Sequence, residues 1–140
     1  CIYDLRPLAE AFEIIGCQCQ IETSGTYEVI TTNNTWVTVS PKVAMKGKLP
    51  VLKSALERAN EIKHPVGTQK DIDHLDELLA SAGVSPKTIV ALQPISQKPR
   101  ATQLCIDTCV ERNWRLSIQT HKYLSKRCFM KEYFGIQIPV

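Results

Sequence analysis

The 140-residue sequence has no long hydrophobic run, since no segment approaches the roughly 20 consecutive apolar residues that a membrane-spanning helix needs. It has no large excess of either charge, because 17 Lys and Arg residues against 14 Asp and Glu residues give a net charge of +3. No polybasic segment and no clustered basic stripe is present, so we expect neither a membrane nor a nucleic acid as a partner. With 44% hydrophobic and 22% charged residues, the composition excludes a disordered tail and is typical of a globular protein of one domain.

The six cysteines lack the paired CxxC spacing of a structural zinc site. Cys105 and Cys109 are four residues apart in a segment of helical period, so we expect both to face a core as small apolar side chains. Cys17 and Cys19 would point the same way from a strand, and we expect the same of them. The sequence also lacks a glycine-rich phosphate loop and a nucleophile paired with a base. With no secretory signal in view, we expect a cytoplasmic protein with reduced thiols.

Helical and strand periods alternate along the chain. The expected helices cover 8–15, 51–56, 72–79 and 101–113, and the expected strands cover 17–22, 36–39, 61–66, 88–92 and 115–120. Gly16 and Gly83 are expected to end the first and third helices. Pro50 fits the first turn of the second helix, and Asp71 is expected to cap the third. This order predicts an α/β fold with a parallel sheet, in which the first two strands are joined by a turn rather than a helix.

Polar side chains follow each expected strand at its carboxyl end, in the segments 22–26, 40–42, 64–65, 93–96 and 119–122. In parallel α/β folds the strand ends gather at one rim, where ligands bind. Lys42 could pair there with a carboxylate, and Gln93 offers both a donor and an acceptor to a heterocycle. His64, which precedes a proline, is interpreted as a turn residue. Of the three histidines, His121 is the best placed for a role at the rim, because it directly follows an expected strand. These residue types predict a small-molecule site, while a rim that is polar only because loops are hydrated stays an alternative.

Five strings, in their order and combination, resemble the 7-carboxy-7-deazaguanine synthase family of radical S-adenosylmethionine enzymes. They are QIETSGT at 20–26, WVTVSPK at 36–42, ALERANEIKHPVG at 55–67, ALQPISQK at 91–98 and RLSIQTHKYL at 115–124. The resemblance runs from about residue 1 to 124 and implies a partial (βα) barrel of the radical S-adenosylmethionine type without its amino-terminal strands. The expected domains are 1–124, the carboxyl-terminal part of that barrel, and 125–140, an atypical tail.

The resemblance implies a carbon–nitrogen lyase that converts 6-carboxy-5,6,7,8-tetrahydropterin to 7-carboxy-7-deazaguanine with loss of ammonia, on the route to the tRNA base queuosine. In this family a [4Fe–4S] cluster binds S-adenosylmethionine and cleaves it to a radical, and Mg²⁺ assists the rearrangement. The protein supplies orientation and excludes water. The resemblance also implies an electron donor such as flavodoxin or ferredoxin, and a homodimer.

Carried over position by position, the resemblance implies two sets of binding residues. S-adenosylmethionine would contact Ser40, Pro41, Lys42, Glu22 and Ser24. The pterin substrate would contact Gln93, Pro94, Ile95, Ser96 and His121. The resemblance assigns no catalytic residue and no metal ligand within this sequence.

Two features depart from the family pattern. None of the six cysteines has the C-x₃-C-x₂-C spacing of the cluster motif. The Gly-Gly-Glu-Pro motif and the magnesium-binding threonine would precede residue 1. We therefore expect this chain to be a carboxyl-terminal portion that is inactive alone. Two alternatives stay open: a non-catalytic half barrel that binds pterin or S-adenosylmethionine, and a decayed reading frame.

Overall fold

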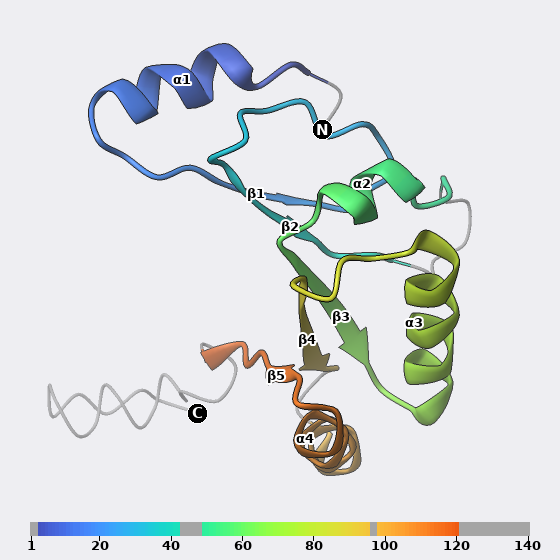
Figure 1. The fold of residues 1–140 in the computed structure, drawn as a ribbon. Helices are drawn as coiled ribbons and strands as arrows, with labels where there is room; N and C mark the ends of the chain where they lie inside the picture. Colours follow the sequence, from blue (N-terminus) through green and yellow to red (C-terminus); the bar gives the residue numbers. More distant parts are fainter. Residues whose placement is uncertain (1–2, 43–48, 96–97, 121–140) are drawn as a thin grey trace, which may run out of the picture.

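The computed structural model describes residues 3–42, 49–95 and 98–120, which form one sheet and four helices (Figure 1). The strands are β1 (Gln20–Thr23), β2 (Trp36–Val39), β3 (Glu61–Val66), β4 (Ile89–Pro94) and β5 (Arg115–Leu116). The helices are α1 (Arg6–Ile14), α2 (Lys53–Arg58), α3 (Gln69–Ala82) and α4 (Pro99–Arg112). All neighbouring strands are parallel, and their order across the sheet is their order along the chain. The predicted α/β class is confirmed.

The two faces of the sheet differ in chemistry, because successive side chains of a strand point to opposite faces. One face carries Ile62 and Leu92, which are fully buried in a single apolar cluster with side chains of α2, α3 and α4. Burial alternates from residue to residue along β3. The opposite face carries polar strand residues, and an ion pair between Glu22 and Lys63 joins β1 to β3 there. The sheet therefore has one face for the core and one polar face.

The start of α3 illustrates how the sequence positions a helix on the apolar face of the sheet. Thr68 is the N-cap, and Asp71 completes a capping box by accepting hydrogen bonds from the Thr68 N–H (2.8 Å) and hydroxyl (3.2 Å). The cap thus lies three residues before the predicted one. Ile72 and Leu75 then face the sheet fully buried, and Gly83 ends the helix at φ +62°.

The parallel strands β1 and β2 are joined by the loop 24–35, which contains no helix, as the sequence predicts. Arg58 of α2 donates from Nη2 to the carbonyl oxygens of Thr32 and Thr35, both at 2.9 Å. Its Nη1 donates to Asn60 Oδ1 at 3.2 Å, and the same oxygen accepts the Val37 N–H at 2.9 Å. Side-chain hydrogen bonds, rather than the packing of a connecting helix, therefore fix the conformation of this loop.

The predicted apolar stripe of the first helix is not covered by the described residues. Leu8, Phe12 and Ile15 are 56%, 44% and 70% exposed, and α1 contributes Ala9 to the buried residues. Gly16 follows the helix with φ +80°, as expected of a residue that ends it. Helical period predicts the helix correctly, but it does not specify which surface packs on it.

Other predicted boundaries are corrected. β1 begins at Gln20, so Cys17 and Cys19 precede the strand, and neither is a buried core residue. β5 ends at Leu116 rather than at 120, because its register with β4 covers only two residues. α2 begins at Lys53, which leaves Pro50 outside it: the Leu52 N–H donates to the Gly25 carbonyl at 2.8 Å and holds this stretch extended.

The predictions for Cys105 and Cys109 are confirmed, since both are buried on the inner side of α4. Burial, assisted by the neighbouring Cys109, raises the pKa of the Cys105 thiol to about 11. These cysteines therefore act as small apolar side chains of the core. Within the described ranges, no helix has the length and apolar character needed to cross a membrane.

Candidate functional site

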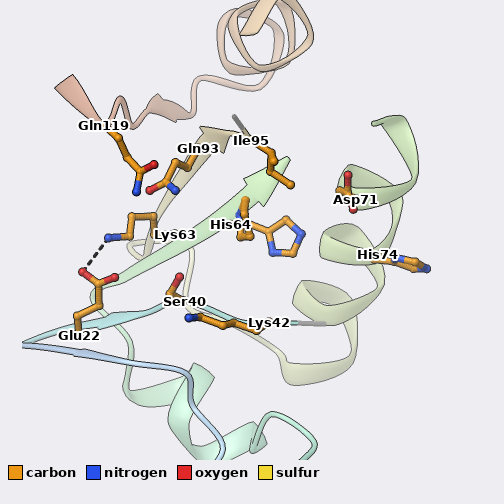
Figure 2. Close-up of a pocket in the computed structure, with 11 residues that line it drawn as sticks. Glu22, Ser40, Lys42, Lys63, His64, Asp71, His74, Gln93, Ile95 and Gln119 are labelled. Carbon is orange, nitrogen blue, oxygen red and sulfur yellow. Dashed lines mark hydrogen bonds and ion pairs between the residues drawn. The ribbon is translucent and has the colours of Figure 1, made fainter. Parts of the chain in front are cut away.

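A pocket of about 420 Å³ lies toward the carboxyl ends of the central strands, bordered by the first turns of α3 (Figure 2). Its lining residues are Glu22, Ser40, Lys42, Lys63, His64, Pro65, Asp71, His74, Gln93, Ile95 and Gln119. Most of these side chains are polar, and they come from β1, β3, β4, α3 and the segments after β2, β4 and β5. The predicted rim of converging strand ends is therefore present and hollow.

Five of the residues expected to bind ligands line this one pocket: Glu22, Ser40, Lys42, Gln93 and Ile95. They come from both expected sets, the S-adenosylmethionine set and the pterin set. Parallel strands bring them together because their carboxyl ends meet at the same edge of the sheet. Their roles as ligand contacts remain predictions.

The other expected binding residues do not line the pocket, or lie outside the described residues. Ser24 is half-buried, and its hydroxyl pairs with that of Thr26 at 3.0 Å. Pro41 and Pro94 are buried, and neither borders the pocket. The expected contacts Ser96 and His121 lie outside the described residues.

Sequence reasoning assigned no ligand to the other six lining residues, although it placed three of them, His64, Pro65 and Gln119, at the polar rim. The remaining three, Lys63, Asp71 and His74, it missed altogether as site residues. The interpretation of His64 as a turn residue is wrong, because it lies within β3 and is only 3% exposed. The alternation of Ile62, His64 and Val66 is the signal that could have found it, since these three side chains share the buried face of the strand. The same alternation turns Lys63 to the opposite, polar face.

An ion pair crosses one end of the pocket. Lys63 Nζ donates to Glu22 Oε2 at 2.7 Å, and the two side chains are 20% and 55% exposed. Figure 2 shows Gln93 and Gln119 at the same end, with their amide groups near this pair. This end therefore offers one ammonium, one carboxylate and two neutral amides.

The other end of the pocket contains a buried imidazole. His64 Nδ1 is the one buried side-chain nitrogen or oxygen in the described part of the chain that has no hydrogen-bond partner. Burial lowers the pKa of His64, although the Asp71 carboxylate opposes that shift. Burial also disfavours ionisation of Asp71, but hydrogen bonds from Gly67 and Thr68 outweigh it and lower the pKa of this carboxyl. Close to pH 7 the pair is thus a neutral imidazole beside a carboxylate.

The buried imidazole predicts a pH dependence of stability. Because the pKa of His64 is lower in the folded chain than in the unfolded one, the unfolded chain binds more protons as the pH falls below about 6.5. The free energy of unfolding should therefore be highest above that pH and decrease toward the folded pKa. Replacing His64→Gln should flatten this dependence, measured as the slope of unfolding free energy between pH 7 and pH 5. Gln119→Ala, a change on the same pocket that removes no titratable group, is the control and should keep the slope. Equal slopes in both variants would contradict the assignment.

The described residues do not fit the metal groups that the family resemblance implies. Within the described ranges, no group of three or more His, Cys, Asp or Glu side chains could hold a metal ion. Cys17 and Cys19 precede β1, whereas Cys105 and Cys109 are core residues of α4 with raised pKa values. Iron–sulfur clusters are held by thiolates, and raised pKa values disfavour thiolates. No step through a cluster or Mg²⁺ follows from these residues.

Comparison with known proteins identifies close relatives, although no protein-family model matches the chain. It is 64% identical over 125 residues to the 7-carboxy-7-deazaguanine synthase of Escherichia coli (strain K12), over 89% of this chain and 56% of that protein. It is 42% identical over 127 residues to the 7-carboxy-7-deazaguanine synthase of Buchnera aphidicola, over 91% of this chain and 56% of the relative.

A solved structure has the same fold. The crystal structure of QueE from Escherichia coli matches with a TM-score of 0.81 and 63% sequence identity, over 85% of this chain and 52% of that chain. The chain thus spans about half the length of the curated relatives that it matches. In sequence and in fold alike, it corresponds to a carboxyl-terminal portion of the 7-carboxy-7-deazaguanine synthases.

Proposed function

We propose that this chain forms one wall of the active site of a 7-carboxy-7-deazaguanine synthase, a lyase of the radical S-adenosylmethionine class that acts in queuosine synthesis. The supporting observation is that residues expected to bind two different molecules line one pocket. Ser40 and Lys42 belong to the cofactor set, and Gln93 and Ile95 belong to the pterin set. Two molecules that react with each other must be held side by side, so a shared pocket is what this function requires.

The chemistry of each side chain suits such a site. The exposed ammonium of Lys42 attracts the carboxylate of S-adenosylmethionine. The amide of Gln93 offers a donor and an acceptor to the edge of a pterin, and Ile95 offers apolar contact to its ring. When bound, S-adenosylmethionine supplies the radical that abstracts hydrogen, while these residues hold and orient the two ligands.

The sheet supports a wider version of the proposal, in which it is part of a (βα) barrel. Its strands are all parallel and follow chain order, and the apolar cluster with α2, α3 and α4 lies on one face. Barrels of this type have that arrangement, with helices outside and side chains of the other face inside. The proposal also includes a homodimeric state, an electron donor such as flavodoxin or ferredoxin, and a cytoplasmic location.

Ligand binding tests this function directly. Isothermal titration calorimetry should show that the chain binds both S-adenosylmethionine and 6-carboxypterin, a stable oxidised analogue of the substrate. Gln93→Ala should weaken 6-carboxypterin about tenfold, because losing one or two hydrogen bonds costs roughly 1–2 kcal/mol, and should leave S-adenosylmethionine unchanged. Lys42→Met should do the reverse. Circular dichroism of both variants controls for folding.

Two results would contradict the proposal. If neither ligand binds the folded chain, the pocket is not part of this active site. If each variant weakens both ligands equally while the fold is intact, the two expected sets of residues do not belong to separate ligands.

One observation favours a second candidate, a non-catalytic module that binds pterin or S-adenosylmethionine. The described residues include no donor set for a metal cluster. Reconstitution of the chain with iron, sulfide and a reductant, followed by an assay for 5′-deoxyadenosine, separates the two candidates. Formation of 5′-deoxyadenosine supports the enzyme, and binding of ligands without it supports the module.

A further inference from the structure

We propose that Lys63 binds the carboxylate of the pterin substrate and exchanges its ion pair with Glu22 for that group. The inference rests on the proposed function, which supplies a substrate and a product that both carry a carboxyl group. Among the described residues expected to bind the pterin, Gln93, Pro94 and Ile95 carry no charge, whereas the Lys63 ammonium lines the same pocket.

The position of Lys63 is unusual for a lysine. It lies in the middle of β3, the central strand, and its side chain is only 20% exposed. Its neighbour across the register with β4 is Ala91, whose small side chain leaves room beside the lysine stem. Lysine is rarely held this far from water unless its charge has a partner. A half-enclosed ammonium on the wall of a pocket is well suited to bind an anion, because water screens it less than it screens an exposed charge.

The existing partner of Lys63 is easily displaced. Glu22 contacts it at 2.7 Å, but the glutamate side chain is 55% exposed and regains hydration when it swings away. Ion pairs with an exposed member contribute little to stability, so exchange for a ligand carboxylate is not strongly opposed. Figure 2 shows this pair at the end of the pocket that holds Gln93 and Gln119. A pterin whose ring contacts Gln93 would therefore have its carboxylate within reach of Lys63.

Lys42 is the other described cation that lines the pocket, and it does not fit this role as well. It is exposed beyond the end of β2, and Figure 2 shows its ammonium near Ser40, whereas Lys63 lies near the amides of Gln93 and Gln119. Its charge is therefore more screened by water than that of Lys63. Lys42 suits the carboxylate of S-adenosylmethionine, and Lys63 suits that of the pterin.

The test compares two ligands that differ only in the carboxyl group, 6-carboxypterin and pterin, with dissociation constants measured from pterin fluorescence. The unchanged chain should bind 6-carboxypterin about tenfold more tightly than pterin, as expected for a charge-assisted hydrogen bond. Lys63→Met should abolish this preference without weakening pterin, and Lys63→Arg should retain part of it. Lys53→Met is the matched control, because Lys53 lies on α2 in an exposed ion pair with Glu57 and should keep the full preference.

Each outcome decides the inference. A preference for 6-carboxypterin that survives in Lys63→Met overturns it, while the proposed function stands. Failure of the unchanged chain to bind either pterin overturns both. A second pair of ligands, S-adenosylhomocysteine and methylthioadenosine, tests the source of the carboxylate. If Lys63→Met instead removes a preference for S-adenosylhomocysteine over methylthioadenosine, the lysine binds the carboxylate of the cofactor. The assignment to the pterin is then overturned.

Discussion

Replacing Gly25 by alanine should lower the free energy of unfolding by about 3 kcal/mol. Gly25 has φ +74°, a backbone conformation that costs an L-residue roughly 1–2 kcal/mol. A Cβ at this position would lie 2.8 Å from Val39 Cγ1 and 3.1 Å from Val51 Cγ1. Overpacking of this kind typically costs a further 1–3 kcal/mol or so. Chemical denaturation of Gly25→Ala measures the sum.

Gly16→Ala is a matched control for the strained backbone alone. Gly16 has φ +80°, and a Cβ there would meet no atom within 4 Å. It should cost only about 1 kcal/mol, so the difference between the two variants isolates the contact with Val39. In a double-mutant cycle, Val39→Ala should lower the free energy of unfolding less in the Gly25→Ala variant than in the unchanged chain, because it removes the crowding methyl group. Equal destabilisation in the two single variants would show that the close approach is absent.

Replacing Arg58 by methionine should also lower the free energy of unfolding, by about 3 kcal/mol. Methionine keeps the apolar stem but loses three hydrogen bonds, to the carbonyls of Thr32 and Thr35 and to Asn60 Oδ1. Hydrogen bonds to a charged group each contribute roughly 1.5–3 kcal/mol, and water replaces some of them at this half-buried position. Thr35 is 1% exposed, so its carbonyl gains little from solvent.

Two further variants give this prediction its controls. Arg100→Met, at an exposed position on α4, should change stability by less than about 0.5 kcal/mol. Arg58→Lys should fall between the two, because a lysine keeps the charge but cannot present the planar fork of donors that reaches three oxygens. A cost as small in Arg58→Met as in Arg100→Met would show that the loop 24–35 does not depend on these bonds.

Much of the fold is predictable because its signals are local. The strand at 61–66 is predicted with the bounds that the structure gives, since alternation begins after Asn60 and stops at Gly67. The gathering of Ser40, Lys42 and Gln93 is also predictable, because it follows from parallel strands ending at one edge. Neither result requires knowledge of which helix packs where.

The features that sequence reasoning missed depend on tertiary structure. A histidine before a proline has the local chemistry of a turn, and only packing of α3 on β3 makes His64 a buried wall of the pocket. The ion pair of Lys63 likewise could not be predicted from local sequence, because its partner Glu22 lies 41 positions away in the chain. The exposed stripe of Leu8 and Phe12 is another feature that depends on tertiary structure, because helical period predicts a helix but does not specify what covers it.

The division of each strand between an apolar and a polar face has a consequence for protein engineering. In β3, Ile62 and Val66 belong to the packed interior, while Lys63, one position along, can be exchanged without opening it. Libraries that randomise only positions on the polar face of the sheet, such as Lys63 and Gln93, should therefore yield mostly folded variants with altered ligand preference. Libraries at the intervening positions should yield mostly unfolded ones, so the parity of residue number along a strand would sort tolerant sites from intolerant ones.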